Sequence, residues 1–454
     1  MKINMFGMKK IGGLKKVLVA VVLIHMALGA LTGHTIAGEY NYISISNPFM
    51  NKIPIAVPYF SAMSGNADEK KIAREASDLL AETLEFTGFF KVIDRDAFLE
   101  DPSQQGIVTS RINFKNWRTI GAELLITGGV LVSSDQVEME FRLFDIFKEK
   151  LLIGKRYKGN IDDTRRMVRR FAKEVIFQLT GKNGIFESKI AFVSSTSGSK
   201  ELYICDFDGY DPIKITHKNK LTFSPAWSSD GRYIAFTSYA RGKADLYIKN
   251  LSGKRGAVVD LPGVNLSPCW MPGRFELVAS LSFSGDQEIY LLTGTGKIIK
   301  RLTNQWDIDV SPSISPDGGQ MAFVSRRSGG PQLYVMDMGS GSVRRLTFQG
   351  NYNTSPSWSP AGDKIAFVGM VHNAIDIYVM DAKGGGAIQL THNTGDNEFP
   401  TWSPDGNLIA FSSTREGGRP KVYVMTSFGT DQRRLIAMTG EQSCPRWSPS
   451  EIDY

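Results

Sequence analysis

One stretch of the chain, residues 399–411, reads FPTWSPDGNLIAF and predicts two short strands joined by a tight turn. Pro404-Asp405-Gly406 supplies the turn, because proline presets φ and glycine accepts the positive φ that a Cβ resists. In the second strand Ile409 and Phe411 point to one side and Ala410 to the other. The stretch therefore predicts one hairpin of a β-sheet.

This hairpin recurs along the chain. Its opening proline returns at intervals of 43 to 45 residues, at Pro225, Pro268, Pro312, Pro356, Pro400 and Pro445. An alanine of the second strand and a tyrosine of a third strand follow the same period, at Ala191, Ala235, Ala279, Ala322, Ala366 and Ala410 and at Tyr203, Tyr247, Tyr290, Tyr334, Tyr378 and Tyr423. A period of about 40–45 residues with four short strands per unit is typical of a β-propeller. Six copies predict six blades.

The first and last repeats begin and end at different points of the unit. The first starts at its second strand, residues 189–193, and the last stops just after Pro445-Arg446-Trp447. We therefore expect strand 444–449 to complete the blade formed by residues 189–216, which closes the ring and removes two exposed sheet edges. One large apolar residue per repeat is predicted to pack between blades: Trp227, Trp270, Ile314, Trp358, Trp402 and Trp447.

Residues 38–181 have a different, mixed α/β pattern. A helix capped by Asn66 and ending at Gly88 is expected, and a second from an Asp162 or Asp163 cap to Gly181. Strands are expected at about 53–60, 90–94, 123–131, 137–145 and 151–158. One face of the second helix is basic and is predicted to be solvated: Arg165, Arg166, Arg169, Arg170 and Lys173. Residues 182–188 form a linker to the propeller at 189–454.

Residues 1–37 have the layout of a secretory signal peptide, with a basic start, an apolar run from Val17 to Leu31 and small residues after it. Cleavage is expected after Ala37, with cleavage after Gly29 and an uncleaved membrane anchor as alternatives. Five lysines of this leader carry most of the formal charge of +7, so the mature chain retains only +2. That small charge argues against a nucleic-acid partner. The mature protein is expected to be exported, with no membrane span.

The sequence lacks the motifs of disulfide frameworks, metal sites and catalytic sites. Cys205, Cys269 and Cys444 are odd in number and lie in separate repeats, so they predict buried core residues rather than a disulfide framework. Paired Cys or His residues at metal-ligand spacing are absent, as are a Gly-x-Ser-x-Gly elbow and a phosphate loop. The Asp-Gly pairs lead directly into aliphatic strands and predict turns. No enzyme activity, cofactor or metal is therefore expected.

One repeat position is polar in all six blades, three residues before the proline. It holds Thr222, Asn265, Asp309, Asn353, Asn397 and Gln442. Six-fold closure arranges these residues around one mouth of the central channel. They form either the turns that lead into the inner strands or the rim of a binding surface, and both interpretations stay open.

The Pro-x-Trp-Ser-Pro-Asp-Gly and Ile-Ala-Phe repeats, behind a leader and a mixed α/β region, resemble the TolB family of Tol-Pal systems over the whole chain. The resemblance implies a non-enzymatic periplasmic adaptor that supports outer-membrane integrity and its invagination during cell division. It also implies that the lipoprotein Pal binds at the channel mouth and TolA binds the mature N-terminus around residues 39–48. Other Tol components or outer-membrane proteins are further candidate partners. The competing class is an exported propeller enzyme, either sugar-acting or peptidase-related.

The Pal-binding rim that this resemblance implies contains the polar ring and its neighbours. The neighbours are Leu266, Ser267, Val310, Ser311, Thr354 and Glu398.

Overall fold

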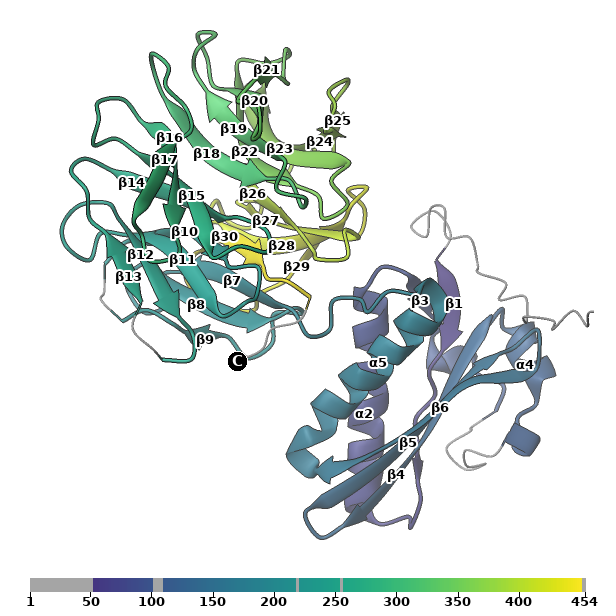
Figure 1. The fold of residues 1–454 in the computed structure, drawn as a ribbon. Helices are drawn as coiled ribbons and strands as arrows, with labels where there is room; N and C mark the ends of the chain where they lie inside the picture. Colours follow the sequence, from purple (N-terminus) through teal and green to yellow (C-terminus); the bar gives the residue numbers. More distant parts are fainter. Residues whose placement is uncertain (1–51, 101–108, 218–219, 254–255, 451–454) are drawn as a thin grey trace, which may run out of the picture. The chain divides into compact units, whose positions relative to one another are not determined.

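The computed structural model describes residues 52–100, 109–217, 220–253 and 256–450. An α/β domain is followed by a six-bladed β-propeller (Figure 1). The predicted leader and the mature N-terminal segment lie outside the described residues.

The α/β domain is built on one mixed sheet with strand order β3-β1-β4-β5-β6, and β2 pairs with β4. β1 runs parallel to β3 and β4, whereas β4, β5 and β6 are antiparallel. The strands are β1 (Ile53–Ala56), β2 (Ser61–Ala62), β3 (Phe90–Val92), β4 (Leu124–Ser133), β5 (Gln136–Asp145) and β6 (Lys150–Asn160). The strand expected at 53–60 is thus shorter, and a second short strand follows it.

Two long helices lie side by side against this sheet (Figure 1). α2 (Ala67–Phe86) begins as predicted, with the Asn66 side chain accepting the Glu69 N–H at 2.7 Å. α5 (Thr164–Thr180) ends at Gly181, whose φ of 71° is the left-handed conformation that glycine adopts freely. Phe171 of α5 stacks on Phe141 of β5 with ring centroids 4.9 Å apart, and alternate β5 side chains are buried in the core.

The opposite face of the sheet has its own small core. Phe144 packs with Trp117 of α4 (Phe114–Thr119), a short helix that the sequence did not predict. The described residues of the domain also form three single-turn 3-10 helices: η1 (Arg95–Ala97), η2 (Thr109–Arg111) and η3 (Ile161–Asp163).

Each propeller blade is a four-stranded antiparallel sheet that runs from an inner strand at the channel to an outer edge strand. From the inside outward, the first blade consists of β10 (Thr222–Trp227), β11 (Tyr233–Ser238), β12 (Asp245–Asn250) and β13 (Ala257–Val259). The second consists of β14 (Asn265–Trp270), β15 (Glu276–Leu281), β16 (Glu288–Thr293) and β17 (Ile298–Arg301). The third consists of β18 (Asp309–Ile314), β19 (Gln320–Ser325), β20 (Gln332–Asp337) and β21 (Val343–Arg345). The next two are β22 (Tyr352–Trp358), β23 (Lys364–Val371), β24 (Ala374–Asp381) and β25 (Ile388–Gln389); β26 (Asn397–Trp402), β27 (Leu408–Ser413), β28 (Lys421–Thr426) and β29 (Arg433–Arg434). The sixth joins the ends of the array: β30 (Gln442–Trp447), β7 (Lys189–Ser194), β8 (Glu201–Asp206) and β9 (Ile213–Lys214).

The sixth blade closes the ring. β30 pairs antiparallel with β7, and Trp447 lies opposite Ile190. The closing strand expected at 444–449 therefore starts two residues earlier, at Gln442. The inner edge of β7 is covered by a strand from the far end of the chain.

The repeat tryptophans join neighbouring blades. The indole N–H of Trp270 donates to the carbonyl of Ala226 at 3.1 Å, and that of Trp402 to the carbonyl of Ser357 at 3.0 Å. All five tryptophans and Ile314 are buried, as expected for residues that pack between blades. The turn aspartates behave as predicted too, since Asp405 accepts the Ser403 hydroxyl at 2.6 Å.

The prediction that the basic face of α5 is solvated is wrong for two residues. Arg169 pairs with Asp206 at the end of β8 and lies 3.5 Å from Asp208, and Arg165 also pairs with Asp208. Burial of Asp206 raises its pKa, but its bonds to Arg169 and Lys189 outweigh that effect and hold the pKa below the ordinary value. Helical spacing identifies the polar face of α5 but cannot show which carboxylates approach it.

Candidate functional site

The polar ring lies at the channel mouth, but its side chains are not exposed. All six are only 0–4% accessible to solvent. Their amides hold the loops that lead into the inner strands: Asn265 Nδ2 donates to the carbonyl of Leu261 at 2.9 Å, and Gln442 Nε2 donates to that of Thr439 at 2.6 Å. Asp309 instead accepts from Arg327 at 2.7 Å. This burial favours the turn-forming interpretation for the ring, since a buried polar group needs such a partner.

A left-handed residue follows two places later in every inner strand. Its φ lies between 49° and 55° in all six blades, at Ser224, Ser267, Ser311, Ser355, Phe399 and Cys444. The register between the first and second strands of each blade shifts there. A non-glycine residue in this region costs on the order of 1–3 kcal/mol. Because the bulge repeats in every blade, it belongs to the architecture of the mouth, where bulges commonly redirect side chains.

The side chains just before the bulge form a second ring at the mouth, and this ring is half-buried. It contains Phe223, Leu266, Val310, Thr354, Glu398 and Ser443. Burial raises the pKa of Glu398, and the nearby Asp396 carboxylate raises it further. Of the predicted rim residues, those outside the polar ring are thus half-buried: Leu266, Ser267, Val310, Ser311, Thr354 and Glu398.

Two exposed aromatic residues in loops that lead into inner strands are not predicted by the sequence pattern. Trp306, in the loop that leads into β18, is 85% exposed, and Phe348, in the loop that leads into β22, is 73% exposed. The Arg345 guanidinium lies over the Phe348 ring at 5.0 Å. Neither aromatic repeats from blade to blade, so the period that locates the strands gives no sign of them. The only signal is an aromatic residue in a loop rich in Asn, Gln and Gly.

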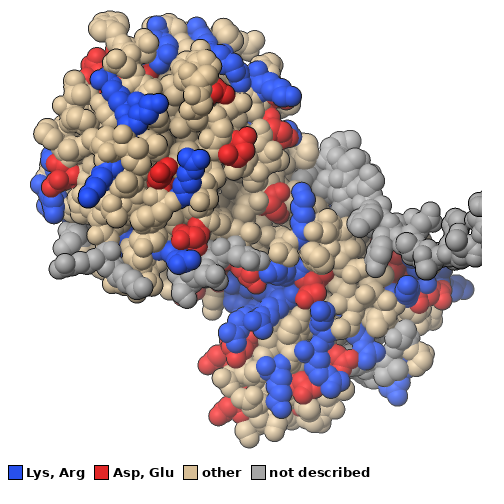
Figure 2. Space-filling view, viewed as in Figure 1, with Lys and Arg blue, Asp and Glu red and all other residues tan. Residues whose placement is uncertain are grey.

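Charge does not gather on the face of the propeller that Figure 2 shows, where basic and acidic side chains are interspersed. This agrees with the small charge of the mature chain. Over residues 52–100, 109–217, 220–253 and 256–450, no three His, Cys, Asp or Glu side chains cluster as metal ligands. In the same stretches no helix is long and apolar enough to span a membrane.

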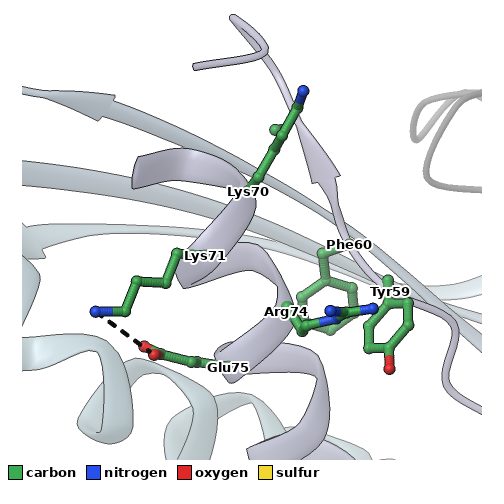
Figure 3. Close-up of a pocket in the computed structure, with 7 residues that line it drawn as sticks. Tyr59, Phe60, Lys70, Lys71, Arg74 and Glu75 are labelled. Atoms are coloured by element: carbon green, nitrogen blue, oxygen red, sulfur yellow. Dashed lines mark ion pairs between the residues drawn. The ribbon is translucent and has the colours of Figure 1, made fainter. Parts of the chain in front are cut away.

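A cavity of about 700 Å³ lies on the α/β domain between α2 and the segment before β2 (Figure 3). Arg74 and Arg95 both approach the Tyr59 ring, at 4.4 and 4.1 Å from its centroid. Lys70 points away from Arg74, and Lys71 turns toward Glu75. The cations therefore do not converge on one point, which makes this cavity a weaker candidate than the propeller mouth.

The cysteines are only partly as expected. Cys205 and Cys444 are buried and unpaired, but Cys269 is half-buried. Cys269 lines a cavity at the other end of the channel, because the inner strand turns this repeat position toward the channel and away from the blade core.

Comparison with known proteins is consistent with this architecture. A family model described as the TolB beta propeller domain matches residues 177–451, and one described as the TolB amino-terminal domain matches residues 41–152. The crystal structure of TolB from Acinetobacter baumannii superimposes with a TM-score of 0.75 at 27% identity, covering 88% of this chain and 97% of that one.

Curated relatives are also similar in sequence. The "Tol-Pal system protein TolB" of Desulfosudis oleivorans is 56% identical over 284 residues, which are 63% of this chain and 65% of the relative. The "Protein TolB homolog" of Chlorobium chlorochromatii is 40% identical over 69% of this chain and 70% of its own length. With a propeller-domain match that spans more than half of the residues, the chain belongs to the TolB family.

Proposed function

We propose that this protein is an exported, non-enzymatic adaptor of a Tol-Pal system that binds Pal at the channel mouth. The observation that carries the proposal is the pair of exposed aromatic side chains, Trp306 and Phe348, in the loops that lead into the inner strands β18 and β22. Large exposed apolar residues next to a concave mouth are typical of interaction sites, and tryptophan is enriched among the residues that dominate them. The name of the Desulfosudis relative supports membership of a Tol-Pal system.

The six-fold mouth suits one protruding partner element. Six short segments converge there, and each contributes a different side chain at the position before the bulge, from Phe223 to Glu398. Such variation shapes a surface for one partner more readily than a uniform ring does. The rim is thus centred on Leu266, Ser267, Val310, Ser311, Thr354 and Glu398, with Trp306 and Phe348 as anchors.

The second contact of the adaptor uses the mature N-terminus. TolA is proposed to bind the segment around residues 39–48, after signal-peptide cleavage delivers the protein to the periplasm. Linking two envelope partners in this way accounts for a role in outer-membrane integrity and in division without any catalytic step.

A pull-down from envelope extract tests the proposal. The wild-type protein should recover a Pal lipoprotein, identified by mass spectrometry, and the Trp306→Ala/Phe348→Ala variant should not. The Phe147→Ala variant is the matched control, because Phe147 is also an exposed aromatic residue (62%) but belongs to the α/β domain. Equal recovery of Pal by all three proteins would refute the site. Hydrolysis of glycosides or peptides by the purified protein would instead favour the enzyme class.

A further inference from the structure

The channel ends, opposite the proposed rim, in a cavity of about 470 Å³ that we call the vestibule. Its walls come from the residues that follow the repeat proline in each blade, including the tryptophans and the Ser-Pro turns. The described residues that line it include 226–229, 268–272, 312–314, 357–360, 401–404 and 446–450.

One position of each blade lies on the inner wall of the vestibule, directly after the repeat proline. It holds Ala226, Cys269, Ser313, Ser357, Thr401 and Arg446. Arg446 is the one charged residue among the described lining residues. It is half-buried, and none of the described residues forms a hydrogen bond or an ion pair with its guanidinium. Burial lowers the pKa of Arg446, but an arginine in a protein keeps its charge.

Two hydroxyl groups on the same wall can each donate a hydrogen bond. Ser313 Oγ accepts the backbone N–H of Trp358 at 3.0 Å, and Thr401 Oγ1 accepts that of Trp447 at 3.3 Å. Each hydroxyl therefore retains its own proton for another acceptor. The guanidinium and these hydroxyls belong to residues that line one small cavity, so its wall offers a positive charge and two hydroxyl donors.

The carboxylates of the Asp-Gly turns do not pair with Arg446. The turn aspartates Asp230, Asp317 and Asp405 each accept the hydroxyl of the serine two residues earlier, at 2.5–2.6 Å. They do not line the vestibule.

We propose that the vestibule is an anion-binding site, in which a carboxylate- or phosphate-sized oxyanion pairs with Arg446 and accepts hydrogen bonds from Ser313 and Thr401. A cation that has lost part of its hydration gains most from a counter-charge inside a confined, poorly screened space. The site is independent of partner binding at the opposite mouth. The oxyanion comes from solution.

Calorimetric titration of inorganic phosphate into the mature protein, in chloride-free buffer of low ionic strength, tests the site. Arg446→Met should weaken phosphate binding about tenfold or more. Arg446→Lys should retain much of it, because the charge stays while the planar fork is lost. Arg232→Met, on an exposed turn, is the matched control and should bind like the wild type.

Selenate anomalous scattering from crystals of the wild type should place the anion at Arg446. The proposal fails if the wild type does not bind phosphate, if Arg446→Met binds as tightly, or if the anomalous peak lies elsewhere.

Discussion

Replacing Trp447 by alanine removes a large side chain from the blade that closes the ring. Trp447 is 7% exposed, and its indole N–H donates to Ser188 Oγ at 2.8 Å. Truncation of a buried aromatic residue costs about 3–5 kcal/mol, and loss of the indole hydrogen bond adds about 1 kcal/mol. Ser188 still donates to the carbonyl of Ile185 at 2.6 Å, so no donor is stranded. The expected loss is about 4–6 kcal/mol, a large share of the ~5–15 kcal/mol that stabilises an ordinary domain.

Urea unfolding followed by circular dichroism measures this loss. Trp447→Phe should cost about 1 kcal/mol, mainly for the missing indole N–H, and thus separates the hydrogen bond from the packing. Trp306→Ala is the matched control, since its side chain is 85% exposed and surface changes usually shift stability by less than about 0.5 kcal/mol. A Trp447→Ala protein that unfolds at the same urea concentration as the wild type would refute the closure argument.

Three further predictions concern charge and export. Arg169→Met should lower stability by about 1.5–3 kcal/mol, because Asp206 loses one charged donor but keeps Lys189, whereas Arg170→Met on the exposed face should have little effect; equal urea midpoints would contradict the ion cluster. Glu69 is buried and accepts the N–H groups of Ser64 and Val132. Burial raises the pKa of Glu69, but these hydrogen bonds outweigh that effect and hold the pKa below its ordinary value. The stability that ionised Glu69 contributes is therefore present above about pH 4.3 and is lost as the pH falls through the lower folded-state pKa. The stability difference between wild type and Glu69→Gln should therefore shrink in acid, and a difference that grows as the pH drops would oppose this account. N-terminal sequencing of the periplasmic protein should begin at Gly38 or Glu39, and an intact Met1 in the membrane fraction would contradict cleavage.

The repeat predicts most of the fold because the same residue types occur at the same strand positions six times. The proline, alanine and tyrosine positions locate the strands, and the phase of the last repeat identifies β30 as the partner of β7. Capping chemistry at Asn66 and Gly181 locates both long helices. The short helix α4 has no such signal, since Asn113 makes no side-chain cap hydrogen bond and six residues are too few for a clear period.

The candidate site is harder to predict, because periodicity shows position in a blade but not exposure to solvent. The period places Asn397 at the start of an inner strand, where the structure has it. The amide N–H groups of Asn397 already donate to the carbonyl of Gly395 and the carboxylate of Asp376, which the period does not show. Trp306 departs from the repeat, so the period cannot indicate it. Helical spacing places Arg169 on the polar face of α5. It cannot show that Asp206, which belongs to the propeller, pairs with Arg169 there.

Titration of the purified periplasmic domain of Pal into the mature protein tests the central claim most directly. Trp306→Ala and Phe348→Ala should each weaken binding about thirtyfold, the equivalent of about 2 kcal/mol, and Val310→Glu at least tenfold. Phe147→Ala should bind like the wild type, and melting curves should show that all variants are folded. Normal Pal binding by the three mouth variants, or a loss in Phe147→Ala as large as theirs, would contradict a Pal site at the mouth of the channel.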